Sequence, residues 1–317
     1  MKLFGRSTRR SLILDHCYKD EILDAALAEA RDGHVGASMT VLRECRHDPE
    51  TRMLRADRLG TCLFGYGDQI AKLGHDRRDP ELLLVAGASY IEEAWRIRGI
   101  GPASTMSHQQ KLKFGATLQL ALSPLMTASE LLPDDAVPWA LLQTVSRGLG
   151  FTRAEQDSIW TQAVDRAPDL YAAHSARLQA LCEKWYGSSE EMLEFAVDTV
   201  ASARPGSPLT TMLPIAYFEL FAAAESRLKP WRLAERMFHD AAGPIAEASR
   251  KWRTGAKPHP RSYQAHNMFF AACALAGDRE GAAEHLRGMG DRLNPWPWCY
   301  LEDDPAEAFH RLSGRYS

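Results

Sequence analysis

Apolar residues recur every three or four positions along almost the whole chain, and this spacing limits the fold more than any other feature. Between positions 209 and 223 a set of apolar residues recurs every three or four positions: Leu209, Met212, Leu213, Ala216, Tyr217, Leu220 and Ala223. On a helix of 3.6 residues per turn, these side chains lie on one face. No long stretch alternates apolar and polar residues, as a half-buried strand would. The sequence therefore predicts an all-α protein.

Capping residues followed by proline mark the beginnings of several helices. Asp48-Pro49, Asp79-Pro80 and Ser207-Pro208 each place a capping side chain before a proline, whose missing N–H costs nothing in the first helical turn. Thr152 and Glu155 have the spacing of a capping box. With the stop signals, these features predict helices over residues 19–31, 35–46, 50–63, 80–97, 108–132, 138–147, 153–166, 169–183, 189–203, 208–227, 230–250, 260–276, 279–289 and 304–312.

Proline and glycine also interrupt the helical pattern. Pro124 falls inside the segment 108–132, so we expect either a kink there or a new helix capped by Ser123. The least regular stretches are residues 98–107 and 254–260. We expect each of them to be a hinge or a loop over a groove.

Composition and charge exclude several classes of protein. The chain has 45% hydrophobic and 25% charged residues, which is typical of a globular protein and not of a disordered or fibrous one. The formal net charge is −3, so the chain lacks the overall positive field that drives most nucleic-acid binding. We therefore expect no nucleic-acid partner.

The expected location is the cytoplasm. The six cysteines lie far apart without a CxxC pair, which predicts reduced thiols and no disulfide framework or zinc site. The apolar stretch after the basic N-terminal residues spans only Leu12 to Leu14, too short for a secretory signal. No window approaches the roughly 20 apolar residues needed to cross a bilayer.

Three prolines recur at nearly equal intervals. Pro133, Pro168 and Pro205 are separated by 35 and 37 residues, close to the period of about 34 residues in tetratricopeptide repeats. That repeat places small and large residues at fixed positions upstream of its proline. The matching sets are Ala121, Leu125, Ala128 and Pro133; Ala37, Val41 and Pro49, with Glu44 as the exception; and Trp160, Ala163 and Pro168, with Gln156 as the exception.

The chain thus resembles a tetratricopeptide-like α-solenoid with degenerate repeats. The resemblance implies a right-handed α-α superhelix of antiparallel helix hairpins over residues 19–294. An N-terminal segment would occupy residues 1–18, and a C-terminal aromatic and acidic cap residues 295–317. The alternative is a non-repetitive helical bundle whose prolines are evenly spaced by coincidence.

Three short segments are similar to an uncharacterised group of actinobacterial tetratricopeptide-like proteins. They are Arg98-Gly99-Ile100-Gly101, Pro138-Trp139-Ala140 and the segment from Lys184 to Glu190. This resemblance implies architecture only, because no catalytic residues are assigned in that group.

Sequence motifs for catalysis and cofactor binding are missing. The eleven histidines form neither HExxH nor an i, i+4 pair, and the chain has no GxxxxGK[ST] loop, GxGxxG turn or GxSxG elbow. We therefore predict no metal, no cofactor and no catalytic residue. Whether the protein is an enzyme stays open, because a site without a known motif escapes this test.

The superhelix, if present, has a concave groove lined by the first helix of each pair. Alignment by the prolines places six residues there: Ser175, Gln179, Glu183, Glu219, Gln264 and Asn267. The set is neutral to acidic, which favours a peptide with basic or apolar side chains. Alternatively, the chain's own C-terminus fills the groove.

An aromatic segment near the C-terminus is a second candidate. Trp296, Trp298 and Tyr300 precede the acidic run Glu302-Asp303-Asp304. Rings beside carboxylates could hold a cationic ligand, or the segment could cover the apolar face of the last helical pair.

The sequence therefore predicts a protein-interaction scaffold that binds a peptide or protein segment in a helical groove. The alternative is an enzyme or a small-molecule-binding regulator with a pocket between helices, near residues 98–107 or 296–300. The oligomeric state is not indicated.

Overall fold

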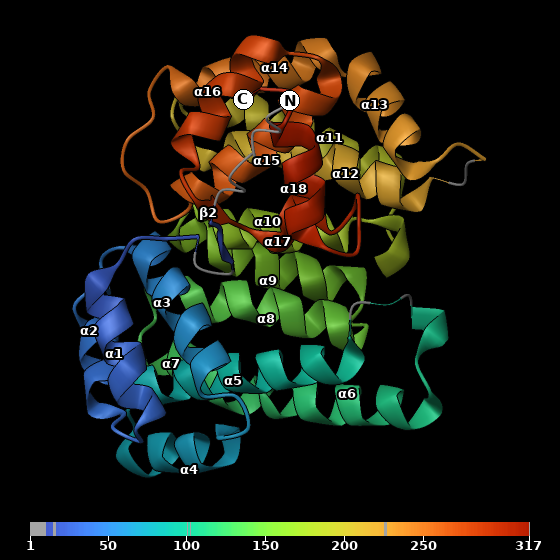
Figure 1. Cartoon of the computed structure of the whole chain (residues 1–317). Helices are drawn as coiled ribbons and strands as arrows, with labels where there is room; N and C mark the ends of the chain where they lie inside the picture. Colours follow the sequence, from blue (N-terminus) through green and yellow to red (C-terminus); the bar gives the residue numbers. More distant parts are fainter. Residues whose placement is uncertain (1–10, 15–16, 100, 102, 225–226, 317) are drawn as a thin grey trace, which may run out of the picture. The chain divides into compact units, whose positions relative to one another are not determined.

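The computed structural model shows two compact units (Figure 1). It describes residues 11–14, 17–99, 101, 103–224 and 227–316. The N-terminal unit is Asp20–Tyr186, and the C-terminal unit combines Met1–Lys19 with Gly187–Ser317. Almost all secondary structure in the described residues is helical, which confirms the predicted all-α class.

The N-terminal unit consists of ten α-helices and two short 3₁₀ helices in its described residues. Their bounds are α1 (Glu21–Arg31), α2 (Gly36–Arg43), α3 (Pro49–Cys62), α4 (Gly67–Arg77), α5 (Pro80–Arg98), η1 (Ala103–Thr105), α6 (His108–Leu120), α7 (Leu122–Leu131), α8 (Val137–Leu149), α9 (Arg153–Arg166), α10 (Tyr171–Ala180) and η2 (Glu183–Trp185).

The C-terminal unit is also helical and contains one small sheet. Its elements are β1 (Ile13–Leu14), α11 (Ser189–Ser202), η3 (Pro208–Thr211), α12 (Met212–Ala223), α13 (Pro230–Asp240), α14 (Ala242–Arg253), α15 (Ser262–Ala276), α16 (Arg279–Gly288), β2 (Arg292–Leu293), α17 (Pro295–Trp298) and α18 (Pro305–Ser313). Strands β1 and β2 pair in parallel, with Ile13 opposite Arg292. Among the described residues, no helix has the length and apolar character required to span a membrane.

The predicted caps begin the helices where the sequence indicates. Asp48, Asp79 and Ser207 each accept a backbone N–H from the first turn that follows. Thr152 and Glu155 form the full capping box of α9. These local signals could be read without tertiary information because the donor and the acceptor are at most three residues apart.

Internal prolines divide two of the predicted helices, 108–132, where an interruption was expected, and 230–250, where none was. The segment 108–132 divides after Leu120, and the segment 230–250 divides after Asp240. Each break lies four residues before a proline, Pro124 and Pro244, because the ring clashes with the carbonyl of residue i−4. Helix α7 therefore begins at Leu122 with Ala121 as its N-cap, so the expected interruption at Pro124 is present, whereas Ser123 caps no new helix.

Helix α4 is missing from the predicted helices, because its sequence is polar and contains two glycines. Both glycines are required by close packing against α5. A Cβ at Gly67 would lie 2.6 Å from the Tyr90 ring, and one at Gly74 would lie 2.9 Å from the Leu83 side chain. The residues that weaken the helical pattern are the ones that let α4 approach α5.

One helix is central to each unit. Helix α5 has most of its residues buried and packs against α3, α4, α6, α7 and α8. In the C-terminal unit, α15 is buried along most of its length by α13, α14, α16, α17 and α18. The main core therefore surrounds these two helices, both of which were predicted as helical segments.

Candidate functional site

A groove runs between α1 and α2 in the N-terminal unit. Its volume is about 580 Å³. Nine residues line it: Glu21, Ile22, Ala25, Ala26, Glu29, Ala37, Thr40, Val41 and Glu44. The lining therefore combines aliphatic and small side chains with three glutamates.

The helical spacing of both helices produces this surface. On α1 the lining positions 22, 25, 26 and 29 follow an i, i+3, i+4, i+7 pattern, and on α2 positions 37, 40, 41 and 44 do the same. Ala25 and Ala37 are short, which leaves the space between the helices open. Ile22 is 56% exposed although it is a large aliphatic side chain. The floor is thus an apolar strip accessible from outside the unit.

Acidic side chains border the strip. Glu21, Glu29 and Glu44 are all exposed, and none of them forms an ion pair with a cation in the described part of the chain. Lining residues of the groove carry no positive charge. Because these carboxylates lie beside low-dielectric side chains, they give the groove a negative potential.

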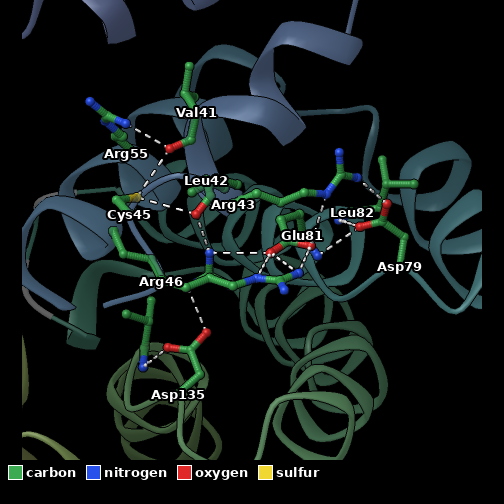
Figure 2. A network of polar contacts seen from close by, with 12 residues as sticks. Val41, Leu42, Arg43, Cys45, Arg46, Arg55, Asp79, Glu81, Leu82 and Asp135 are labelled. Carbon is green, nitrogen blue, oxygen red and sulfur yellow. Dashed lines mark hydrogen bonds and ion pairs between the residues drawn. The ribbon is translucent and has the colours of Figure 1, made fainter. Parts of the chain in front are cut away.

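Two buried arginines of α3 hold α2 in place. The Arg55 guanidinium donates to the Val41 carbonyl at 2.7 Å (Figure 2), and Arg52 donates to the Leu42 carbonyl at 2.7 Å. These carbonyls belong to the last turn of α2, where the i→i−4 hydrogen bonds of the helix end and the helix dipole favours a cation. The Leu42 carbonyl also accepts from the Cys45 N–H. The Cys45 thiol donates to the same two carbonyls. The C-terminal end of α2, and with it one wall of the groove, is therefore fixed to α3.

Carboxylates balance the charge of these arginines. Asp20 accepts from Arg55 at 2.8 Å, and Asp135 accepts from Arg52 at 2.7 Å. Asp20 also accepts a hydrogen bond from the Leu23 N–H, so the same carboxylate caps α1. The ion pair with Asp20 raises the pKa of Arg55 although burial opposes the charged form. Both walls of the groove are thus anchored to α3.

Glu81 lies among three arginines at the start of α5 (Figure 2). Its side chain is fully buried, and Arg46 binds it through two nitrogens at 2.8 and 2.9 Å. The neighbouring Asp79 accepts from Arg43 at 2.7 Å. Burial alone raises the pKa of Asp79, but backbone N–H groups and Arg43 outweigh it and lower that pKa. Because its charges are paired internally, we interpret this network as a support for the groove and not as a ligand site.

The residues predicted for a single groove are divided between the two units. Ser175 and Gln179 lie half-buried on α10, and Glu183 is exposed at the start of η2, all within the N-terminal unit. Glu219, Gln264 and Asn267 lie in the C-terminal unit. None of the six lines the groove between α1 and α2.

Asn267 binds the chain's own C-terminal segment. Its amide nitrogen donates to the Tyr263 and Arg292 carbonyls, and its amide oxygen accepts from the Asn294 N–H and the Trp298 indole. These four bonds use the full capacity of the amide, and the side chain is completely buried. The C-terminal segment of the chain therefore occupies the polar groups of Asn267, which leaves none of them for a ligand.

The aromatic segment divides into buried and exposed residues. Trp298 is fully buried against Phe270 and Phe309, so it belongs to the core of the C-terminal unit. Tyr300 donates its hydroxyl to the buried Glu219. Trp296 is 49% exposed and contacts Tyr300 with 4.8 Å between ring centroids. The covering role predicted for the segment therefore fits Trp298, whereas Trp296 stays accessible.

Arg98 and Trp185, which belong to two of the segments singled out in the sequence, lie close together in the N-terminal unit. Arg98 and Arg147 each lie 5.2 to 5.5 Å from the ring centroids of both Trp95 and Trp185. Burial lowers the pKa of Arg98. The rings thus already hold two cations of the chain itself. Residues 100 and 102 of the predicted loop lie outside the described residues.

A serine and two histidines lie together in the C-terminal unit. Ser249 Oγ is 2.8 Å from His285 Nε2, and the other ring nitrogen of His285 is 3.2 Å from His266 Nδ1. Nucleophilic catalysis needs a serine that a substrate can reach. Ser249 and His285 are completely buried. We therefore interpret the row as a buried polar network. No group of three or more potential metal-binding side chains occurs in the described residues.

One signal in the sequence pointed toward the groove. Glu44 occupies a position where the tetratricopeptide pattern has a small residue, and the structure places it at the rim. A glutamate at a helix-packing position indicates that no helix covers it. Glu21 and Glu29 gave no comparable signal, because exposed charges on one helix face are common. In comparisons with known proteins, the chain matches no protein-family model and no curated protein.

Proposed function

We propose that the protein is an interaction module that binds a basic amphipathic helix in the groove between α1 and α2. The proposal rests on one observation: the groove has an apolar floor, and unpaired glutamates lie along its border. An amphipathic helix binds such a groove through apolar anchors at i, i+3, i+4 and i+7. Its lysine or arginine side chains would reach the exposed carboxylates of Glu21, Glu29 and Glu44.

The rigidity of the groove supports this function. Binding costs less when the receiving surface is already ordered. Arg52 and Arg55 fix α2, and Asp20 fixes α1, so the two walls hold their separation before a partner arrives. On binding, only the partner therefore has to lose conformational freedom.

We also propose that the helices belong to a tetratricopeptide-like α-α superhelix, as the proline spacing predicts. Packing within the N-terminal unit supports this, because most contacting helices are adjacent or next but one in the chain, such as α1 with α2 and α3. Contacts of α3 with α8 and α10 depart from a strict nearest-neighbour stack. A solenoid of this kind would present the groove at its N-terminal end.

Binding can be measured with a designed peptide by fluorescence anisotropy. The probe is a labelled 18-residue helix of leucine and lysine with helical spacing, and its twin carries glutamate in place of every lysine. We expect the lysine peptide to bind and the glutamate twin to bind at least tenfold more weakly. Higher ionic strength should weaken the lysine peptide, because the pairs are exposed to solvent.

Matched variants locate the binding surface. The triple variant Glu21→Gln, Glu29→Gln and Glu44→Gln should weaken the lysine peptide about tenfold, at up to about 1 kcal/mol for each exposed pair. The control is Glu130→Gln, Glu194→Gln and Glu247→Gln, which changes the net charge equally at exposed positions outside the groove. Equal binding by both triple variants, or equal binding of both peptides, would contradict the proposal.

A further inference from the structure

A second cavity lies between the end of α1, the end of α3 and α4 in the N-terminal unit. Its volume is about 410 Å³, within the range of small-molecule sites. Most of its lining is apolar: Ala30, Val35, Leu63, Ile70, Leu73 and Leu82. The remaining lining residues are Gly33 and four with polar side chains, Arg31, Cys62, Tyr66 and Gln69.

The packing of α4 leaves this space open. Helix α4 presents Gly67 and Gly74 to α5, and the two glycines bring the helix axes close together. The adjacent face, with Tyr66 before the helix and Gln69 and Leu73 in it, lines the cavity instead. The turn after α1 contributes Gly33, whose φ of +88° favours glycine and which adds no side chain to fill the space. The hollow therefore follows from where α4 packs.

The cavity is lined by a single charged side chain, the cation Arg31. Arg31 is exposed at the last turn of α1 and makes no hydrogen bond or ion pair within the described residues. Tyr66 is 58% exposed and offers a hydroxyl donor, and Gln69 offers an amide donor. No carboxylate lines the cavity. Burial raises the pKa of the Cys62 thiol and Arg31 lowers it, so Cys62 is a neutral thiol near that cation.

We infer that this cavity binds an amphiphilic carboxylate, with its hydrocarbon body against Ile70, Leu73 and Leu82 and its carboxylate at Arg31. An apolar wall with few polar groups suits a hydrocarbon body, and a lone guanidinium suits a carboxylate, which it can bind through two nitrogens. A neutral or cationic amphiphile would leave Arg31 without a counter-ion. The site shares only α1 with the proposed peptide groove and uses different residues, so each can fail without the other.

Decanoate below its micelle concentration is the probe, and decanol and decyltrimethylammonium are the matched ligands. Isothermal titration of the full chain should show decanoate binding at least tenfold more tightly than either. Arg31→Gln should remove most of that preference and leave decanol binding unchanged. Arg77→Gln is the control, because Arg77 is an exposed arginine of the same unit outside the cavity. Decanoate binding that is no tighter than that of the cation, or is unaffected by Arg31→Gln, would overturn the inference.

Cys62 provides an independent readout in the wild-type chain. Iodoacetamide modification, mapped by mass spectrometry, should slow at Cys62 when decanoate is present. Cys17 and Cys299, which are also partly exposed, should react at an unchanged rate. Leu73→Trp, which fills the cavity, should abolish both decanoate binding and protection. Protection that is equal at all three cysteines, or is absent at Cys62, would show that decanoate binds elsewhere.

Discussion

The two units bury polar side chains in different ways. In the N-terminal unit the buried polar groups include charged ones, such as Arg52 and Glu81, held in ion pairs. In the C-terminal unit they include neutral ones, such as Ser249, His285 and Asn267, held by hydrogen bonds, and the carboxyl Glu219, which accepts from Tyr300. A buried charge is tolerated only with a partner, whereas a buried imidazole gives up its charge. Buried ion pairs therefore distinguish the N-terminal unit, and buried imidazoles the C-terminal unit.

Removing the charge of Glu81 should have the largest effect of the changes considered. Glu81→Gln keeps the volume but leaves Arg46 and Arg52 without their shared carboxylate, at a cost of about 3 to 5 kcal/mol in the free energy of unfolding. Denaturant unfolding measures the loss. Glu92→Gln is the matched control, because its pair with Arg96 is exposed and contributes about 0.3 to 0.5 kcal/mol. Similar losses for both variants would mean that burial does not distinguish the two pairs.

Asn267→Ala should destabilise the C-terminal unit by about 2 to 4 kcal/mol, because it leaves buried donors and acceptors unpaired and creates a cavity. Hydrogen exchange of the segment 292–298 should accelerate, since its bonds to Asn267 are lost. Asn294→Ala is the control and removes only the cap of α17, at about 1 kcal/mol. Unchanged exchange in that segment would refute the anchoring role of Asn267.

Acidification should weaken the C-terminal unit before the N-terminal one. Burial lowers the pKa of His266 to about 4, and burial followed by His266 and Arg253 lowers that of His285 well below its usual value. Glu284 only partly opposes this at His266. Unfolded histidine has a pKa near 6.5, so the unfolded state takes up protons first and stability falls from about pH 6.5 down through pH 4. At pH 5 the loss from His266 is on the order of 2 kcal/mol.

Hydrogen exchange at pH 7.5 and pH 5, corrected for intrinsic rates, separates the units. We expect the gain in exchange in α14–α16 to exceed that in α3 and α5. The lowered pKa of Asp79 confers stability that is lost only below about pH 3.8. In the N-terminal unit, burial also lowers the pKa of His174, but its bond to the Pro168 carbonyl and Asp169 partly offset this. His266→Gln should reduce the pH effect more than His174→Gln, and the reverse order would contradict this comparison.

Helix positions could be predicted from the sequence because their signals are local. Asp48, Asp79 and Ser207 marked helix starts, and the apolar spacing marked most helix bodies. The exceptions depend on contacts distant in the sequence. Helix α4 needs Gly67 and Gly74 to approach Tyr90 and Leu83, which single-segment periodicity does not reveal.

The candidate site was harder to predict than the fold. The sequence predicted a neutral-to-acidic groove that favours a peptide with basic or apolar side chains. Glu44, which breaks the repeat pattern, lies at the rim of the groove between α1 and α2. The expected residues themselves depended on a repeat alignment, which does not show what covers each helix. Asn267 illustrates the difference, because its amide is saturated by residues 263, 292, 294 and 298. Whether a position is free for a ligand is decided by packing between segments far apart in the chain.

The most direct test of the proposed function is hydrogen exchange of the full chain with and without the lysine-leucine peptide. With the lysine-leucine peptide bound, we expect hydrogen exchange to slow mainly in α1 and α2, residues 21–43. The glutamate twin should not change the exchange rates. The C-terminal unit should exchange at the same rate in both samples. Protection that is strongest outside α1 and α2, or equal for the two peptides, would contradict the assignment of the groove as the binding site.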